Sequence, residues 1–314
     1  MSFSAIIDSS QLFPVVTLSD TSSNTKAEIY SFGALLNQFI INTKAGDLNL
    51  IEGFSSPQAA IEDITKGFKS AFLSPFTCRM NEGKYSYADK DYQVEKFFMP
   101  PHAIHGLVFD APFKVENTEV TEIFASVKLT YTYDKEDVGY PFSYSISHIW
   151  KLEAGNKLSV STTIIHNNTH AIPYAQGWHP YFTLGTSIDE CSLQFSTDTQ
   201  VEFDDTLLPT GNTTNDNRFV SGASLKDIFL DNCFHLAGEG TNACILSNEL
   251  VKLTISPEKS YPYLQIYTPP HRKSIAIENL SGAPDCFNNG LGLLLLEPHV
   301  AITFATHYTA EKLA

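Results

Sequence analysis

Alternation of apolar and polar residues with a period of two dominates the chain from about residue 120 onward. Runs of this kind, separated by clusters of Gly, Asn, Asp and Pro, are typical of antiparallel strands with one buried face. Helical periodicity is nearly absent, and neither a linker-like stretch nor a fixed-period repeat divides the chain. We therefore predict a large all-β sandwich that forms one domain over residues 1–314. The clearest alternating sets are Val127, Leu129, Tyr131 and Tyr133, then Tyr144, Ile146, His148, Trp150 and Leu152, then Leu158, Val160, Thr162 and Ile164.

The best candidate for a helix follows Gly53, and it is short. Ser56 can cap it, Pro57 suits the first helical position, and Gly67 can end it. Ala60, Ile61 and Ile64 are expected to lie on its buried face. The rest of the chain predicts few other helices.

Charge and cysteine content limit the possible partners. The 314 residues carry a net charge of −15, which argues against nucleic acid and anionic membrane surfaces as partners, since both attract basic proteins. No signal peptide is evident, and the apolar run 291–296 is too short to span a bilayer. The dispersed, odd number of cysteines fits reduced thiols in the cytoplasm better than disulfides or a structural zinc site; they are Cys78, Cys191, Cys233, Cys244 and Cys286.

The segment Gly177-Trp178-His179-Pro180-Tyr181-Phe182 is the strongest candidate for a functional site. Pro180 biases its predecessor toward extended geometry, so His179 should end a strand. An imidazole can donate or accept a proton near neutral pH, and the flanking aromatic rings could stack on the C–H face of a sugar. The alternative is a histidine that is simply part of the core.

Two earlier stretches carry further candidates. Arg79 precedes a glycine turn, and its forked donors suit two neighbouring oxygens, although from this stretch alone a surface salt bridge is the favoured explanation. His105 is followed by Gly106, which could let the backbone approach a ligand. His102, three residues earlier, is read as structural, and the pair lacks the further ligand that a metal site requires.

Near the C-terminus, Gln265 shares a strand face with Tyr263 and Tyr267, which could line a polar, aromatic pocket. Glu278 directly follows an apolar strand and precedes a Gly/Pro loop, a position at the mouth of a sheet. Glu297 has a similar setting and is the rival carboxylate. Nothing predicts a cofactor: Gly238 and Gly240 imitate a dinucleotide-binding pattern, but no βαβ unit surrounds them.

Taken in order, these stretches resemble the aldose 1-epimerase (galactose mutarotase) family over roughly residues 31–308. The motifs that carry the resemblance are the Arg79 stretch with Gly83-Lys84-Tyr85, His105-Gly106 with Asp110-Ala111-Pro112, Gly177 to Phe182, Leu208 to Gly211, Leu230 to Phe234, and Ala276-Ile277-Glu278 leading to Pro284 to Asn288. The resemblance implies a β-supersandwich fold, His179 as catalytic acid and Glu278 as catalytic base. It also implies substrate contacts from Arg79, His105, Asp231 and Gln265.

The implied reaction is interconversion of the α and β anomers of a free hexose, without metal or cofactor. Cys78 and Leu107 depart from the galactose enzymes, so a sugar other than galactose is possible. Two alternatives remain open: the same chemistry on a hexose 6-phosphate, for which Lys66, Lys69, Arg272 and Lys273 could form a basic rim, and a sugar-binding protein without turnover. The expected partner is a small sugar, and the chain is expected to be a monomer or a homodimer.

Overall fold

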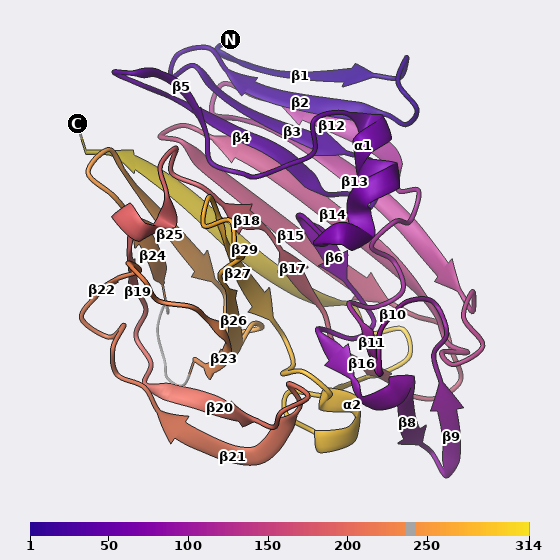
Figure 1. Ribbon diagram of the computed structural model, residues 1–314. Helices are drawn as coiled ribbons and strands as arrows, with labels where there is room; N and C mark the ends of the chain where they lie inside the picture. Colours follow the sequence, from indigo (N-terminus) through magenta and orange to yellow (C-terminus); the bar gives the residue numbers. More distant parts are fainter. Residues whose placement is uncertain (237–242, 314) are drawn as a thin grey trace.

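The computed structural model describes residues 1–236 and 243–313, and it is built almost entirely from antiparallel strands (Figure 1). Three larger sheets account for most of the described strands. The all-β expectation is therefore confirmed. Gly238 and Gly240, named above as a false nucleotide-binding pattern, lie outside the described residues.

The largest sheet has nine strands and contains the alternating segments predicted from the sequence. In its interior strand β14, Tyr144, Ile146, His148, Trp150 and Leu152 are all buried, as the period of two requires. The order across the sheet is β12 (Lys114–Val120), β13 (Phe124–Asp134), β14 (Ser143–Glu153), β15 (Lys157–Ile165), β29 (Ile302–Lys312), β25 (Val251–Pro257), β24 (Cys244–Ser247), β19 (Ser192–Gln194) and β22 (Ala223–Ser224).

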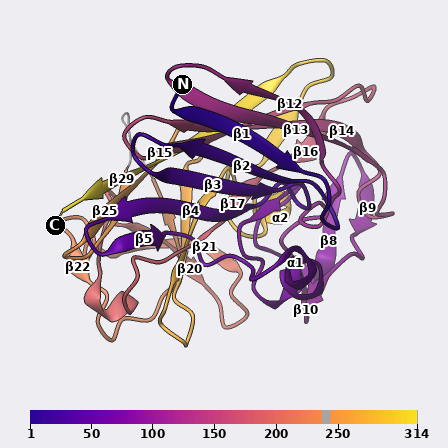
Figure 2. The ribbon, with the colours of Figure 1, turned by 90° about the horizontal axis from the view of Figure 1, so that it is seen from above.

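The N-terminal sheet has five strands and covers part of the nine-stranded sheet, as the view from above shows (Figure 2). Its strand β2 packs against β13 and β14. The Trp150 indole donates a 3.0 Å hydrogen bond to the backbone oxygen of Ala34, which ties the two layers together. The strands follow chain order: β1 (Phe3–Asp8), β2 (Val15–Asp20), β3 (Thr25–Tyr30), β4 (Leu36–Thr43) and β5 (Gly46–Asn49).

The third large sheet has eight strands and differs from the others because its central strands are buried on both faces. One face packs into the main core, and the other is covered by loops and borders a cavity. Its path runs β21 (Pro209–Asn215), β20 (Thr199–Phe203), β23 (Asp231–His235), β26 (Tyr263–Tyr267), β27 (Ile275–Leu280), β17 (Gly177–His179) and β6 (Ala71–Leu73), with β18 (Tyr181–Phe182) also paired to β27.

The remaining described elements are short. Three small sheets contain β10 (Phe98–Met99), β11 (His102–Ile104) and β7 (Arg79–Met80); β16 (Ile172–Tyr174) and β28 (Leu294–Leu296); and β8 (Lys84–Tyr87) and β9 (Lys90–Gln93). The helical segments are α1 (Pro57–Asp63), η1 (Ile64–Lys66), η2 (Asn81–Gly83), η3 (Ile188–Glu190) and α2 (Cys286–Asn289).

The predicted helix is present as α1 and η1. The Ser56 hydroxyl accepts a 3.1 Å hydrogen bond from the Ala59 amide, and Gly67 caps the far end. Ala60 and Ile64 are buried, but Ile61 is 44% exposed. The expectation for Ile61 was wrong because neighbouring residues on a helix point about 100° apart and cannot share its inner face.

No helix among the described residues is long and apolar enough to cross a membrane. All five cysteines are free and buried, in agreement with the expectation of reduced thiols.

Candidate active site

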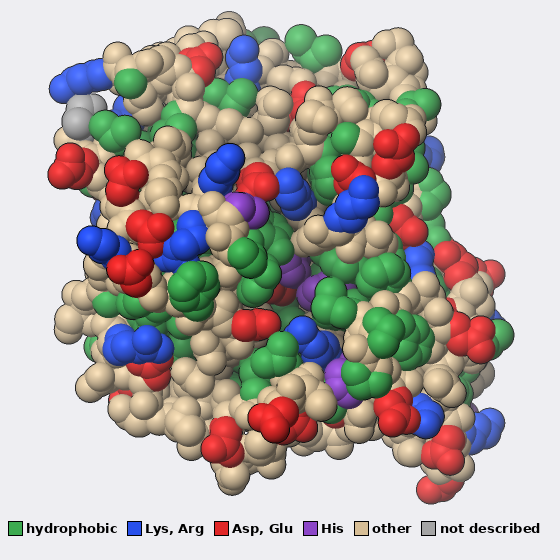
Figure 3. Space-filling view, in the orientation of Figure 1, with side chains coloured by type: hydrophobic (Ala, Val, Ile, Leu, Met, Phe, Trp, Pro, Cys, Tyr) green, Lys and Arg blue, Asp and Glu red, His purple; other side chains and the backbone are tan. Residues whose placement is uncertain are grey.

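A cavity of about 530 Å³ opens over the loop-covered face of the eight-stranded sheet. Its volume falls within the range of about 300–1,000 Å³ that is typical of small-molecule sites. The molecular face in Figure 3 is hollowed near its middle, where histidine, basic and acidic side chains gather. All six residues predicted from the sequence line this one cavity: Arg79, His105, His179, Asp231, Gln265 and Glu278.

Strand register explains why three of these residues meet. Gln265 in β26 lies directly opposite Glu278 in β27, and Asp231 in β23 lies opposite Tyr267 of β26. Side chains at opposed positions, and at every second position along a strand, lie on one face of a sheet. The sheet therefore presents Asp231, Gln265 and Glu278 side by side to the cavity. Gln265 Nε2 donates a 2.8 Å hydrogen bond to Asp231 Oδ1.

His179 ends β17 immediately before Pro180, as predicted. The pairs Gly177 with Leu280 and Trp178 with Asn279 bring His179 beside Glu278. The atoms His179 Nε2 and Glu278 Oε1 are 3.3 Å apart, and both side chains are almost completely buried. An acid–base pair in direct contact therefore lies on the cavity wall.

Burial controls the protonation of this pair. Loss of solvation raises the pKa of Glu278 well above its usual value, and the nearby negative charge of Asp231 raises it further. Burial also lowers the pKa of His179 to about 4. Both shifts favour the neutral form of each side chain. Shifts of opposite sign on adjacent acid and base groups are common where proton transfer occurs.

Arg79 supplies the nearest positive charge. Its guanidinium makes no hydrogen bond or ion pair with the residues that the structure describes, and it borders the cavity. Its charge opposes the rise in the pKa of both Glu278 and Asp231, although burial outweighs it in each. The expectation of a surface salt bridge at Arg79 is not met; its donors are free to meet oxygens of a ligand.

Cys78 and His105 complete the wall near Glu278. The Cys78 thiol donates to Glu278 Oε2 over 3.8 Å. The His105 ring lies edge-on to that of His179, with centroids 4.8 Å apart, and stacks obliquely on Phe68. The His105 amide donates a 2.9 Å hydrogen bond to the Cys78 backbone oxygen, which joins the two residues.

Two sequence interpretations need correction. Trp178 and Phe182 do not face the cavity; both are buried in the main core, and of the three aromatic residues only Tyr181 borders the cavity. Trp178 and His179 are adjacent in a strand, so they must point to opposite faces. Gly106 does not line the cavity: a Cβ there would lie 2.4 Å from the Ser74 backbone oxygen, so the glycine permits close packing of two chain segments.

The two rival residues lie elsewhere. Glu297 is exposed in the turn after β28 and does not line the cavity. His102 is buried, and its Nδ1 accepts a 3.2 Å hydrogen bond from the Glu82 amide, which agrees with a structural role.

Several cavity residues were not among the predicted site residues. Lys66 and Lys69, which follow α1, and His271, in the turn after β26, all lie at the mouth. The basic residues there do not include Arg272, whose guanidinium lies 2.7 Å from Asp189, away from the cavity. Lys66 and Lys69 were noted only as possible parts of a basic rim, because no local pattern shows which loops fold together.

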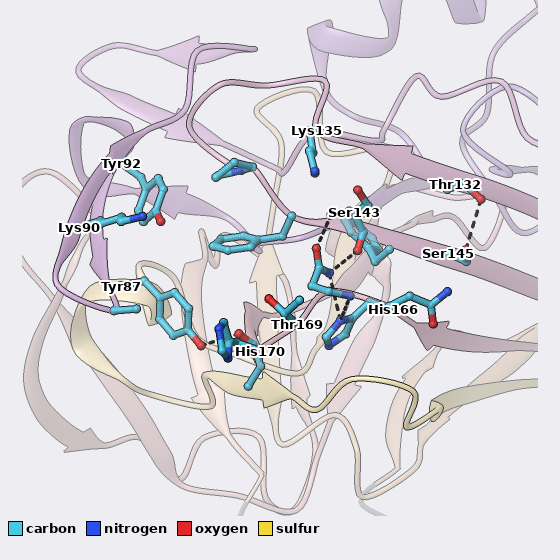
Figure 4. Close-up of a pocket in the computed structure, with 17 residues that line it drawn as sticks. Tyr87, Lys90, Tyr92, Thr132, Lys135, Ser143, Ser145, His166, Thr169 and His170 are labelled. Carbon is cyan, nitrogen blue, oxygen red and sulfur yellow. Dashed lines mark hydrogen bonds between the residues drawn. The ribbon is translucent and has the colours of Figure 1, made fainter.

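A larger cavity, about 700 Å³, lies between β8–β9 and the ends of β13 and β14. Figure 4 shows Lys90 and Lys135 near its edge, with Tyr87, Tyr92, Ser143, Thr169 and His170 around it. No Asp or Glu is among its described lining residues. It therefore offers no buried acid–base pair, and size alone does not make it the better candidate.

Comparison with known proteins identifies relatives of this chain. The sequence profile of the family described as "Aldose 1-epimerase" matches residues 14–309. The protein YihR of Escherichia coli (strain K12) is 28% identical over 248 residues, which cover 76% of this chain and 79% of YihR. The crystal structure of galactose 1-epimerase from Lactobacillus acidophilus NCFM has a TM-score of 0.82 at 18% identity, covering 99% of this chain and 98% of that one. A galactose mutarotase-like protein from Clostridium acetobutylicum has a TM-score of 0.84 at 15% identity, with coverage of 99% and 98%.

Proposed function

This chain belongs to the aldose 1-epimerase family, and on that premise we propose that it interconverts the α and β anomers of a free hexose. Glu278 acts as base, His179 as acid, and the reaction uses no metal or cofactor. Arg79, His105, Asp231 and Gln265 bind the sugar hydroxyls. The buried, free thiols fit a reducing compartment, and we place the reaction in the cytoplasm.

The observation that supports this proposal most directly is the 3.3 Å contact between His179 Nε2 and Glu278 Oε1 at the cavity wall. The anomeric and ring oxygens of an aldose are bonded to the same carbon, so adjacent acid and base groups can each reach one of them. Each positioned acid or base contributes about 10²–10⁴-fold to a rate.

The steps follow from this geometry. Proton transfer across the contact gives the carboxylate and the imidazolium, a form that the Arg79 charge favours. Glu278 removes the proton from the anomeric hydroxyl while His179 protonates the ring oxygen. The C1–O5 bond breaks, the C1–O1 bond becomes a carbonyl, and rotation about C1–C2 exposes the other face. The reverse transfers close the ring and return both protons.

A sugar-binding protein without turnover is the alternative from another class. Burying Glu278 beside Asp231 raises the free energy of the folded chain, because desolvation and like charge both disfavour the carboxylate. A binder could recognise hydroxyls with neutral amides at lower cost. The buried pair therefore supports catalysis over binding alone.

A hexose 6-phosphate is the second candidate substrate, and the observation in its favour is the position of Lys66, Lys69 and His271 at the cavity mouth. Each of these side chains already has a carboxylate partner. Lys66 Nζ lies 2.6 Å from Asp63, Lys69 Nζ lies 2.7 Å from Glu52, and His271 Nε2 lies 3.7 Å from the same carboxylate. The mouth is close to neutral, so we favour the uncharged sugar.

Anomer-exchange NMR tests the proposal. Purified protein is added to glucose, galactose and other aldoses at equilibrium, together with their 6-phosphates, and exchange between α and β signals is measured. We expect catalysed exchange for at least one free hexose, and its loss in His179→Ala. A well-folded protein that binds these sugars without accelerating exchange would instead identify a binding protein.

A further inference from the structure

Cys78, His105 and Glu278 form a cluster of potential metal ligands that no single stretch of sequence suggests. One ligand atom from each residue lies within 4.8 Å of the others, and all three side chains are buried. They come from three places: the turn before β7, the residue after β11, and strand β27. All three line the same cavity, so an ion could reach them from solvent.

The spacing suits a small tetrahedral ion. Ligand atoms about 2.0–2.3 Å from Zn²⁺ lie about 3.3–3.8 Å from one another in a tetrahedron. Cys78 Sγ and Glu278 Oε2 are already 3.8 Å apart. The widest pair in the cluster needs to close by about 1.0–1.5 Å to complete that geometry.

The donor types select the metal. Thiolate, imidazole and carboxylate together are ligands of Zn²⁺ and similar ions, whereas Mg²⁺ and Ca²⁺ prefer oxygen alone. Three protein ligands leave a fourth position open to water or a sugar hydroxyl. His105 Nδ1 is buried with no hydrogen-bond partner among the described residues, a further sign of unused coordination capacity.

The backbone already holds two of the ligands in place. Cys78 and His105 both have a positive backbone φ, 47° and 64°, a conformation that residues other than glycine seldom adopt. Such residues persist where surrounding structure fixes them, and they concentrate at ligand sites. The hydrogen bond between their backbones couples the two positions.

We propose that Cys78, His105 and Glu278 bind one Zn²⁺ ion, and that the ion inhibits the enzyme by occupying the catalytic carboxylate. Binding displaces the protons of the Cys78 thiol and of the Glu278 carboxyl group, both of which leave to solvent, and the ion forms bonds to Sγ, one ring nitrogen and one carboxylate oxygen. With Glu278 bound to the metal, His179 loses its partner for proton transfer. The inhibition, but not the binding, rests on the proposed function. The metal-free protein is the active form, so EDTA leaves the rate of anomer exchange unchanged or increases it.

Co²⁺ serves as the spectroscopic probe of the site. Titration of metal-free full-length protein should give near-ultraviolet thiolate-to-Co²⁺ charge-transfer absorption that saturates at one ion per chain. Cys78→Ser should abolish the band, and Cys233→Ser, which removes a nearby buried thiol outside the cluster, should retain it. Circular dichroism and thermal melting establish that both variants are folded.

Zn²⁺ affinity is then measured by competition with a chromophoric chelator. Loss of one of three protein ligands in Cys78→Ser or His105→Ala should weaken binding by about 100-fold or more. Absence of a thiolate band in folded wild-type protein, or Zn²⁺ binding that is unchanged in Cys78→Ser, overturns the site. Zn²⁺ that binds through Cys78 without slowing anomer exchange in an active protein overturns the inhibition. Zn²⁺ binding through Cys78 in a protein that exchanges no anomers upholds the metal site and rejects the proposed function.

Discussion

The imidazole of His179 and the carboxyl group of Glu278 are in direct contact, 3.3 Å apart, within a site where both are almost fully buried. The two residues are 99 positions apart in the chain and meet because β17 pairs with β27. A buried acid–base contact of this kind should act as one unit in catalysis.

The first prediction tests whether His179 and Glu278 act together in one catalytic step. We expect His179→Ala and Glu278→Gln each to lower kcat for anomer exchange by about 10²–10⁴-fold. The kcat of the double variant should be within about tenfold of the kcat of the less active single variant, because the effects of residues that act in one step are strongly non-additive. Glu297→Gln, at the exposed rival position, is the matched control and should keep full activity. Multiplicative losses in the double variant would contradict joint action.

The second prediction concerns pH. The active pair carries one proton, so the rate should fall at low pH when a second proton binds and at high pH when the last one leaves. The acid limb should lie near pH 4, since burial lowers the pKa of His179 to about 4. The alkaline limb should lie well above the usual pKa of a glutamate, because burial and Asp231 raise the pKa of Glu278. Both limbs belong to the coupled pair.

Asp231→Asn provides the internal check on that assignment. Removing the Asp231 charge lowers the pKa of Glu278, so the alkaline limb should move to lower pH whatever happens to the absolute rate. A profile of kcat/KM against pH measures both the position of the alkaline limb and the absolute rate. An alkaline limb that does not move would show that another group sets it.

The third prediction is that Glu278→Gln stabilises the protein while it abolishes activity. A group whose pKa is raised by folding favours the folded state less as pH rises from its unfolded pKa to its folded pKa. The neutral amide removes this penalty, which grows by at most about 1.4 kcal/mol per pH unit within that window. We expect the Tm difference between variant and wild type to widen from pH 5 upward and to level off above the folded pKa of Glu278.

Thermal melts across pH 5–9 measure this difference. His179 titrates in the unfolded state of both proteins, so that contribution cancels in the comparison. Gln265→Asn, which shortens the side chain opposite Glu278 without changing charge, should show no pH-dependent gain. A Glu278→Gln variant that is less stable at every pH would indicate a structural carboxylate.

The sequence predicted the polar residues of this site well, but not how the chain assembles around them. The alternating pattern was enough to predict the strands. Arg79, His105, His179, Gln265 and Glu278 were each singled out in their own stretch of sequence, and Asp231 was added only by the family resemblance. The opposite orientations of Trp178 and His179 also follow from alternation, so the expectation that Trp178 stacks on a sugar misread a signal that was present. By contrast, the contact between Cys78 and Glu278 depends on pairing between distant segments, which no local pattern encodes.

The residues that meet at the cavity mouth also could not be predicted from local sequence patterns. Lys66 and Lys69 follow a helix, His271 lies in a turn, and Glu52 precedes them all, yet they meet at one opening. Whether a basic residue there is free or paired decides the charge that a substrate meets. Only the folded chain shows that Glu52 contacts both Lys69 and His271.

The last prediction uses these pairs to separate free from phosphorylated sugar. A phosphate ester carries up to two negative charges, and it meets a chain of net charge −15 whose mouth lysines are already paired. We expect glucose or galactose to have a higher kcat/KM than its 6-phosphate in low-salt buffer. Added salt should narrow the difference in kcat/KM between the two sugars, because it screens the repulsion of the phosphate. The Debye length shrinks to about 8 Å near physiological ionic strength.

Glu52→Gln tests the cause of that preference. The variant leaves Lys69 and His271 without their carboxylate, so kcat/KM for the 6-phosphate should rise relative to the free sugar. Glu82→Gln is the matched control: it removes the same charge from a 2.6 Å pair with Lys84, and neither residue lines the cavity. Equal effects of the two variants would show that the preference for the free sugar comes from the overall charge of the protein and not from the pairs at the cavity mouth. A wild-type protein that prefers the phosphate ester at low salt would reverse the choice of substrate, because two lysines would then bind the phosphate despite their carboxylate partners.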